Sequence, residues 1–310
     1  MFFVIPGIYI RSTKTSKVEA GIKINFNYSY LTGKIITMKN VLSTLLIVIA
    51  TAGFLPLQAQ KVLKEVVSLQ MPENEGKNSA AIVWNPVTKK YYTSMAGNAR
   101  YMMGVFDAKG TLLQDDVEAE YDYRGFWYNP ISKRIEFNCY DEDGMGHLEL
   151  DARGNIESKS IDKTGKNQPD EQSVGVYHTA GKCIIYISGN GVITKYHAKT
   201  GEATGTLTTL HPNSKTQKEA DEINEDDEQD RWLIRNNTIV QYTGIPKAEL
   251  AILNVDNRSI ELYDQKTGLM TRTAYRIPEG IELQLSFNFS YTNGIWWFFN
   301  KEEKKWVGFK

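Results

Sequence analysis

Two stretches of this sequence share almost the same plan: "VWNPVTKKYYTS" at residues 83–94 and "WYNPISKRIEFN" at residues 127–138. Each has an aromatic residue, an Asn-Pro turn, a basic pair and then an alternating, strand-like run. Asn85 and Asn129 lie 44 positions apart (129 − 85). A repeat at such an interval is typical of a protein built from several copies of one supersecondary unit.

A second signature follows the first at a nearly constant distance. It is a strand end, a polar turn with glycine and the start of another strand, and it reads "FDAKGTL" (106–112), "LDARGNI" (150–156), "YHAKTGEA" (196–203) and "YDQKTGLM" (263–270). Glycine suits such turns because it adopts positive φ without steric cost. Asp107 follows Asn85 by 22 residues (107 − 85), and Asp151 follows Asn129 by 22 (151 − 129). Each unit is therefore predicted to hold four short antiparallel strands.

The units predict a closed ring of sheets. Complete units are expected at 80–116, 122–161, 173–210 and 237–277, and a unit of only three strands at 283–310. The missing strand is available in "KVLKEVVSLQM" at 61–71, so both ends of the domain would share the last sheet. Radial stacking buries both faces of each sheet and leaves only short edges, and the hairpin turns favour it over a solenoid. The predicted fold class is all-β: a five-bladed β-propeller of four-stranded antiparallel blades, the last closed by the N-terminal strand of the mature chain.

The units resemble the YVTN-type repeats of bacterial surface and periplasmic propellers, which carry a similar Asn-Pro-x-Thr turn, a strand and an Asp-x-x-x-Gly turn. The resemblance extends over residues 80–277, and it is clear in two units and faint in the others. It implies a secreted bacterial β-propeller. Such repeats specify a fold far better than they specify chemistry.

The beginning of the sequence predicts export. From Met38 it reads "MKNVLSTLLIVIATAGFLPLQAQ", with one Lys, an apolar run and the small residue Ala59. This is the layout of a secretory signal peptide at 38–59, with Gln60 as the mature N-terminus; a membrane anchor is the alternative. Residues 1–37 are interpreted as sequence upstream of the true start or as a disordered extension, and 60–310 as one propeller domain. The protein is expected to be secreted or periplasmic, with no membrane contact beyond the transient signal peptide.

Composition narrows the classes of partner. With 36 basic and 37 acidic residues the net charge is −1, which gives no reason to expect binding to nucleic acid. Cys139 and Cys183 are the two cysteines, and neither lies near residue 60, so no lipoprotein anchor is expected. A disulfide between them and two packed free thiols both remain open. The domain is expected to be a monomer without a cofactor.

Longer loops mark the predicted binding face. The second-to-third turns and the connections between blades are longer than the turns on the other face, and such insertions commonly form the binding side of a repeat protein. The candidate ligand-binding residues at the rim of the central channel are Asp122, Tyr123, Arg124, Asp141, Asp143 and Glu171. Tyr and Arg supply stacking area and a bidentate fork for a sugar or a peptide. In the structural alternative, Arg124 pairs with Asp122 or Glu120, and Trp127 lies in the core between blades.

The largest insertion is an acidic loop at 211–235. Between Glu219 and Asp230 it has eight carboxylates and no basic residue. It could bind a divalent cation or a basic partner, but its spacing does not match an EF-hand loop. The alternative is a solvated loop kept soluble by its charge.

Two classes of function fit these features. The first is a secreted, non-catalytic binding or scaffold propeller that recognises a glycan, peptide or protein on its long-loop face. The alternative is a glycoside hydrolase with paired carboxylates at the channel mouth, drawn from Glu120, Asp122, Asp141, Asp143 and Glu171. The predicted inner strands, such as "AAIVW" and "GFWY", carry no acids and favour binding. The four histidines have no metal spacing, and no nucleophile motif, Cys-His spacing or P-loop is found, so no catalytic or metal residue is predicted.

Overall fold

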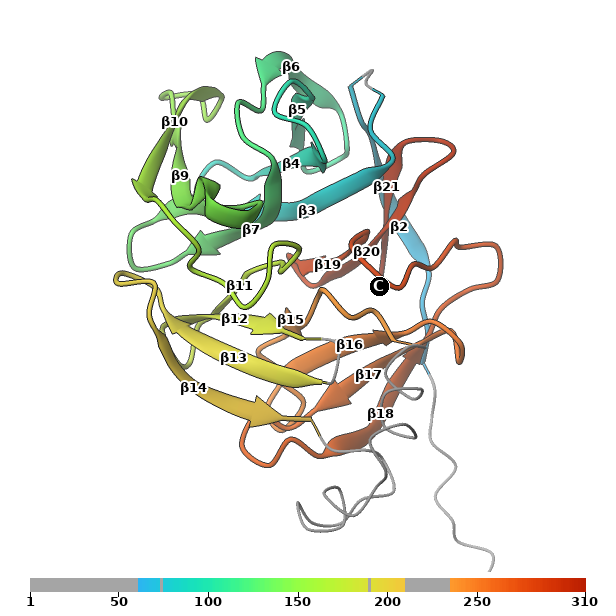
Figure 1. Cartoon of the computed structure of the whole chain (residues 1–310). Helices are drawn as coiled ribbons and strands as arrows, with labels where there is room; N and C mark the ends of the chain where they lie inside the picture. The colour runs from blue at the N-terminus through green and yellow to red at the C-terminus, as the bar shows by residue number, and fades with distance from the viewer. Residues whose placement is uncertain (1–60, 73–74, 189–190, 210–234) are drawn as a thin grey trace, which may run out of the picture. The chain divides into compact units, whose positions relative to one another are not determined.

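The structure is a computed structural model that describes residues 61–72, 75–188, 191–209 and 235–310. They form an all-β fold of five small sheets in a ring, which confirms the five-bladed β-propeller (Figure 1). The predicted extension at 1–37, the signal peptide at 38–59 and all of the acidic insertion except Arg235 lie outside the described residues. Within the described ranges, no helix has the length and apolar character that crossing a membrane requires.

Each blade is an antiparallel sheet whose strands follow one another from the centre of the ring to its outer edge. Blade 1 contains β3 (Asn78–Asn85), β4 (Lys90–Ala96), β5 (Met102–Asp107) and β6 (Leu112–Glu118), and blade 2 contains β7 (Tyr123–Asn129), β8 (Arg134–Cys139), β9 (Met145–Leu150) and β10 (Ile156–Lys163). Blade 3 contains β11 (Val176–His178), β12 (Cys183–Ile187), β13 (Val192–His197) and β14 (Ala203–Thr208), and blade 4 contains β15 (Gln241–Tyr242), β16 (Leu250–Asn254), β17 (Ser259–Tyr263) and β18 (Met270–Arg276). Blade 5 contains β19 (Phe289–Thr292), β20 (Ile295–Asn300), β21 (Lys305–Phe309) and β2 (Glu65–Gln70). The four complete units expected from the repeat agree with these blades to within four residues at each end, whereas the unit expected from residue 283 has its first strand at Phe289.

The first strands of the blades surround the centre of the ring. Strands β3, β7, β11, β15 and β19 contact one another in a closed circuit, and Figure 1 shows them around the middle of the propeller. Their backbones approach closely. A Cβ placed on Gly125 of β7 would lie 2.5 Å from the carbonyl oxygen of Gly175, so only glycine fits there.

The two sequence signatures form turns through their own side chains. In the Asn-Pro turns, Asn85 Oδ1 accepts the amide of Val87 at 2.9 Å and Asn129 Oδ1 accepts that of Ile131 at 2.9 Å. In the Asp-x-x-Gly turns, Asp151 Oδ1 accepts two amides at 2.8 Å, those of Arg153 and Asn155. The Asn155 amide is the main reason that the pKa of Asp151 lies below its ordinary value. Local side-chain bonding of this kind explains why the signatures recur.

The last blade is closed by the other end of the domain, as predicted. Strand β2 pairs antiparallel with β21, so that Glu65 lies opposite Phe309 and Leu69 opposite Trp306. One detail differs from the expectation of a single strand over 61–71. The short strand β1 (Lys61–Val62) pairs in parallel with β18 of blade 4 instead, and the chain then turns into blade 5. The first residues of the domain therefore join two neighbouring blades.

Aromatic residues fill the spaces between blades. Trp296 and Trp297 follow one another on β20 and point to opposite faces of blade 5. Trp296 packs on Tyr275 of blade 4 with ring centroids 5.5 Å apart, and Trp297 packs on Tyr91 of blade 1 at 5.0 Å. Both are buried. The ring arrangement buries both because each face of a blade has a neighbour.

Candidate functional site

The six predicted rim residues lie at one end of blades 2 and 3. Asp122 precedes β7, Tyr123 and Arg124 begin it, and Asp141 and Asp143 lie in the 3-10 helix η1 (Asp141–Asp143) that joins β8 to β9. Glu171 lies in the connection from β10 to β11. The amide of Tyr140 bonds to the carbonyl of Asp122 at 2.7 Å, so the segments before β7 and before η1 are direct neighbours.

Arg124 is held in the structural arrangement that the sequence allowed as an alternative. Its guanidinium pairs with the Asp122 carboxylate, with Nη2 3.1 Å from Oδ2, and Nη1 donates to the Tyr123 carbonyl at 3.0 Å. The guanidinium also lies over the ring of Tyr140, 4.7 Å from its centroid. Only 4% of Arg124 is exposed. Its ion pair is therefore part of the folded rim.

The other rim residues differ in how far they are buried. Tyr123 is fully buried, its hydroxyl donates to the Ala119 carbonyl at 2.8 Å, and burial raises its pKa above the ordinary value. Asp141 is partly exposed, and Asp143 and Glu171 are exposed. Ligand binding by the rim residues stays a prediction.

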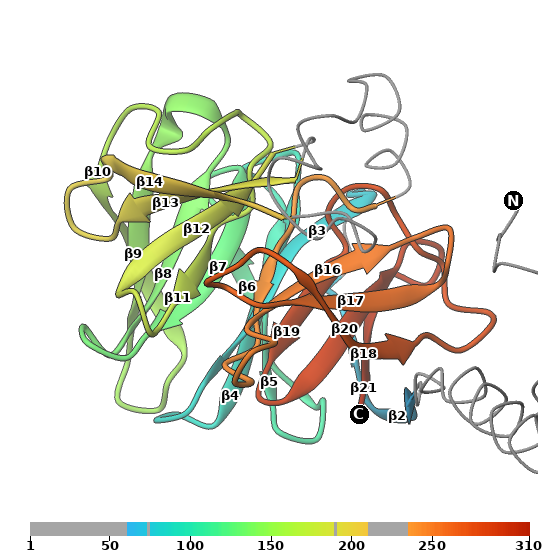
Figure 2. The same cartoon turned by 90° about the horizontal axis from the view of Figure 1, so that it is seen from below.

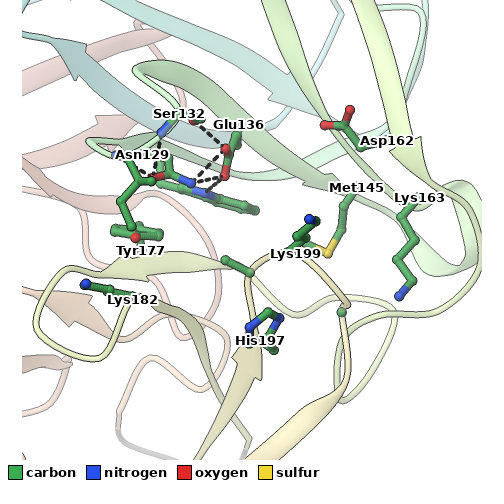
Figure 3. A pocket seen from close by; sticks show the side chains of 15 residues that line it. Asn129, Ser132, Glu136, Met145, Asp162, Lys163, Tyr177, Lys182, His197 and Lys199 are labelled. Carbon is green, nitrogen blue, oxygen red and sulfur yellow. Dashed lines mark hydrogen bonds between the residues drawn. The ribbon is translucent and has the colours of Figure 1, made fainter.

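A cavity of about 650 Å³ lies elsewhere, between blades 2 and 3. We call it the blade 2–3 pocket. Blade 2 and the connection that follows it contribute Trp127, Asn129, Ser132, Glu136, Met145 and Lys163. Blade 3 contributes Tyr177, Lys182, His197, Ala198, Lys199 and Gly201. Its volume falls in the range of pockets that hold small organic ligands. Figure 3 shows Glu136, Asn129 and Ser132 along one wall, with His197 and Lys199 across from them.

Glu136 organises one wall of this pocket. Its carboxylate accepts hydrogen bonds from Trp127 Nε1 at 3.0 Å, from Asn129 Nδ2 at 2.8 Å and from Ser132 Oγ at 2.7 Å (Figure 3). Asn129 is itself held by the Asn-Pro turn, because its Oδ1 accepts the Ile131 amide. The same turn that shapes the repeat therefore positions the wall. Such a network is fixed before any ligand arrives.

The opposite side of the pocket is a pair of turns in contact. The Asp-x-x-Gly-type turn of blade 3 carries His197, Lys199 and Gly201, and Gly201 has φ 69. A Cβ on Gly201 would lie 2.5 Å from Asn167 Oδ1 in the connection after blade 2. Because a glycine is required at this contact, the turn can pack against that connection and close one side of the pocket.

Cations surround the pocket. Lys163, Lys182 and Lys199 line it, and within the described part of the chain none of their ammonium groups has a hydrogen bond or an ion pair. Asp162 also lines this pocket, and its carboxylate bonds through Oδ2 to His147 Nδ1 at 2.8 Å. Glu136 is thus held by the protein and Asp162 is held through one oxygen, whereas the three lysine ammonium groups have no such partner among the described residues.

The sequence did not predict this pocket. Trp127 was expected between blades, and it is buried there against Tyr177 and Tyr186 of blade 3. Glu136, Lys182 and Lys199 carry no motif, and they lie in or beside the short turns on the face opposite the expected one. The available signal was the Ser-x-x-x-Glu spacing from Ser132 to Glu136, which follows the Asn-Pro turn of the second repeat. The first repeat has the turn but not this spacing.

Two further groups bear on chemistry. Cys183 Sγ lies 3.6 Å from His178 Nδ1, a contact across β11 and β12 that the sequence spacing did not suggest. Burial raises the pKa of the Cys183 thiol and lowers that of the His178 imidazole, so both stay neutral and the thiol is not activated. Cys139 and Cys183 are both free and buried. Among the described residues, no group of three or more His, Cys, Asp or Glu side chains could hold a metal ion.

Comparison with known proteins shows the fold alone. No family model and no curated protein matches this sequence. Among solved structures, the glutaminyl cyclase of Myxococcus xanthus is similar with a TM-score of 0.51 at 7% identity, over 81% of this chain and 97% of that chain. An auxiliary nutrient binding protein of Bacteroides ovatus has a TM-score of 0.40 at 10% identity, over 77% of this chain and 60% of that one. The resemblance to YVTN-type repeats stays a prediction.

Proposed function

We propose that this protein is a non-catalytic binding propeller and that it takes a small ligand, or the end of a glycan or peptide chain, in the blade 2–3 pocket. The observation that carries the proposal is the pocket itself: about 650 Å³, with a wall already organised around Glu136. Binding sites are typically concave, largely preformed and furnished with a few positioned polar groups.

Two carboxylates, Asp122 and Glu136, are engaged in ways that favour binding over hydrolysis. A glycoside hydrolase needs one carboxyl group free to donate or accept a proton and a second free to attack or to activate water. Asp122 is paired with Arg124 and also accepts the Gly97 amide at 2.6 Å, and Glu136 is saturated by three donors. The structurally similar glutaminyl cyclase is an enzyme, but a likeness of 7% identity brings only its fold.

The experiment is a ligand screen on residues 60–310 with a pocket-blocking variant. A glycan and peptide array identifies ligands, and Ala198→Trp places an indole in the pocket lining. Ala108→Trp is the matched control, because Ala108 occupies the same position of the equivalent turn in blade 1 and does not line the pocket. We expect binding to be lost in Ala198→Trp and kept in Ala108→Trp. Binding that survives in both variants would place the ligand elsewhere.

The Arg124→Ala variant tests the rim in the same screen. If ligand is lost in Arg124→Ala while Ala198→Trp still binds, the rim of the channel is the site and the pocket is not. Because Arg124 is buried and paired, this variant is first checked for an unchanged circular dichroism spectrum.

Export is part of the same proposal. The layout of residues 38–59 supports a cleaved signal peptide, and a ligand outside the cytoplasm would follow. N-terminal sequencing of protein secreted by its host is expected to begin at Gln60. A mature protein that keeps residues 38–59 would contradict cleavage and favour the anchor.

A further inference from the structure

The blade 2–3 pocket presents hydrogen-bond donors and positive charge but few free acceptors. Its main acceptor, the Glu136 carboxylate, is occupied by Trp127, Asn129 and Ser132. Asn129 Oδ1 is occupied by the Ile131 amide at 2.9 Å. These groups build the wall and have little capacity left for a ligand's donors. The second lining carboxylate, Asp162, is exposed and bonds through Oδ2 to His147 Nδ1 at 2.8 Å.

The donors, in contrast, are available. Lys182 and Lys199 are exposed and Lys163 is half-buried, and no partner for their ammonium groups is present among the described residues. The hydroxyl of Tyr177 likewise has no hydrogen bond in the described ranges, and burial, the main cause, raises its pKa, so it stays a donor at neutral pH. His197 Nδ1 accepts the Thr200 amide at 3.1 Å, so Nε2 is the ring nitrogen left to donate to a ligand.

We infer that the ligand of this pocket is a small organic anion with two or more negatively charged oxygen groups, such as a sugar acid or a sulfated sugar. The inference rests on the proposed function and names the ligand class of the same site. Lys163 ends β10, Lys182 precedes β12 and Lys199 follows β13, so the charges come from three separate segments. They match several anionic groups of one ligand better than a single ion.

The size and the kind of cation support this class. About 650 Å³ is far more than a lone inorganic anion would fill, and the pocket includes apolar surface from Met145 and Ala198 for an organic body. No arginine occurs among the described residues that line it. Lysine acts as a point charge without the planar fork that selects a carboxylate, so carboxylate and sulfate are both acceptable.

Isothermal titration calorimetry on residues 60–310 tests the inference with four probes. Digalacturonate carries carboxylates on a sugar, a disulfated disaccharide from heparin carries sulfates on one, citrate carries carboxylates without a sugar, and cellobiose is the neutral disaccharide. We expect one of the two acidic disaccharides to bind more tightly than cellobiose by tenfold or more. The acidic disaccharide that binds shows whether the pocket takes carboxylates or sulfates. Binding of citrate would show whether the sugar is needed.

Matched lysine variants locate the charges. Lys199→Gln is compared with Lys109→Gln, and Lys182→Gln with Lys89→Gln, because each control occupies the equivalent turn position in blade 1. Lys182 and Lys89 even share a positive φ, 50 and 54, so the backbones of the pair match. Each pocket variant is expected to weaken binding of the acidic disaccharide by about two- to fivefold, as for partly exposed ion pairs, and each control to leave it unchanged. Raising the salt from about 0.05 to 0.5 M should weaken binding further in the parent protein.

The outcomes separate the inference from the proposed function. If cellobiose or a neutral peptide binds as well as the acidic probes, and Ala198→Trp abolishes that binding, the pocket is a binding site but not for anions. If acidic probes bind and the blade 1 controls weaken them as much as the pocket variants, the attraction is a property of the whole surface, and the inference is overturned. If no probe binds and the array yields no ligand sensitive to Ala198→Trp, both proposals fail.

Discussion

Leu69 and Trp306 face each other across the antiparallel pair of β2 and β21, 237 positions apart in the sequence (306 − 69) and both fully buried. Trp306 also reaches into blade 1, where its Nε1 donates to Ser79 Oγ at 2.9 Å and to Thr93 Oγ1 at 3.0 Å. The pair therefore holds the two ends of the domain together and ties the last blade to the first. Closing a ring in this way protects termini that would otherwise fray.

Leu69→Ala is predicted to destabilise the domain by about 2–5 kcal/mol, the usual loss when a buried leucine leaves a cavity. The free energy of unfolding from urea denaturation measures it. Val66→Ala is the control on the same strand, because Val66 is 50% exposed and its loss should change the free energy of unfolding by about 0.5 kcal/mol or less. Equal effects of the two substitutions would contradict closure of the ring by β2.

Tyr92 links blade 1 to blade 2. Its hydroxyl lies 2.7 Å from the carbonyl oxygen of Gly154, in the glycine turn of the neighbouring blade, and its ring is fully buried. Tyr92→Phe keeps the ring and removes this bond together with the one to Thr88 Oγ1 at 2.9 Å, so it should reduce the free energy of unfolding by about 1 kcal/mol or more. Tyr101→Phe is the control, since the Tyr101 hydroxyl has no hydrogen bond in the described part of the chain. If Tyr92→Phe lowers the free energy of unfolding no more than Tyr101→Phe does, the hydrogen bond does not stabilise the contact between blades 1 and 2.

The same tyrosine predicts an alkaline loss of stability. Burial raises the pKa of Tyr92 from 10.0 to about 12. Because the folded pKa lies above the unfolded one, the contribution of Tyr92 is fully present below pH 10.0 and is lost as the pH rises toward about 12. Urea midpoints measured from pH 9 to 11.5 should fall, and they should fall less steeply in Tyr92→Phe. Identical slopes for the two proteins would show that Tyr92 ionises normally.

Much of the fold was predictable because its signals are local. Asn85 and Asn129 each form a turn with the amide two residues on, and Asp151 does the same in the second signature, so the spacing of these residues reports the spacing of strands. The pairing of Arg124 with Asp122, two residues apart, was likewise foreseen as the structural alternative.

The pocket was not predictable because it depends on packing between blades. Lys163 ends one blade and Lys199 lies in a turn of the next. Neither segment contains a residue pattern that predicts its contact with the other. The parallel pairing of Lys61 with Tyr275 was missed for the same reason: a two-residue strand has no periodicity to detect. The contact of Cys183 with His178 also required the register of β11 and β12.

Glu136 is predicted to support the pocket wall and not to bind the ligand directly. Glu136→Gln replaces a carboxylate that accepts hydrogen bonds from three donor groups, and it should lower the free energy of unfolding by about 1.5–3 kcal/mol. Glu157→Gln, at an exposed position of β10, is the matched change and should be neutral. If Glu136→Gln leaves stability unchanged, the three bonds do not organise the wall.

The indole N–H of Trp127 offers the most direct measurement of the central claim, that ligand binds in the blade 2–3 pocket. It donates to Glu136 at the pocket wall, whereas the indole N–H of Trp306 is bound between blades 5 and 1. In nitrogen–proton correlation spectra of residues 60–310, titration with the acidic disaccharide that binds should shift the Trp127 indole resonance and leave that of Trp306 in place. Saturable binding with an unmoved Trp127 resonance would contradict the account.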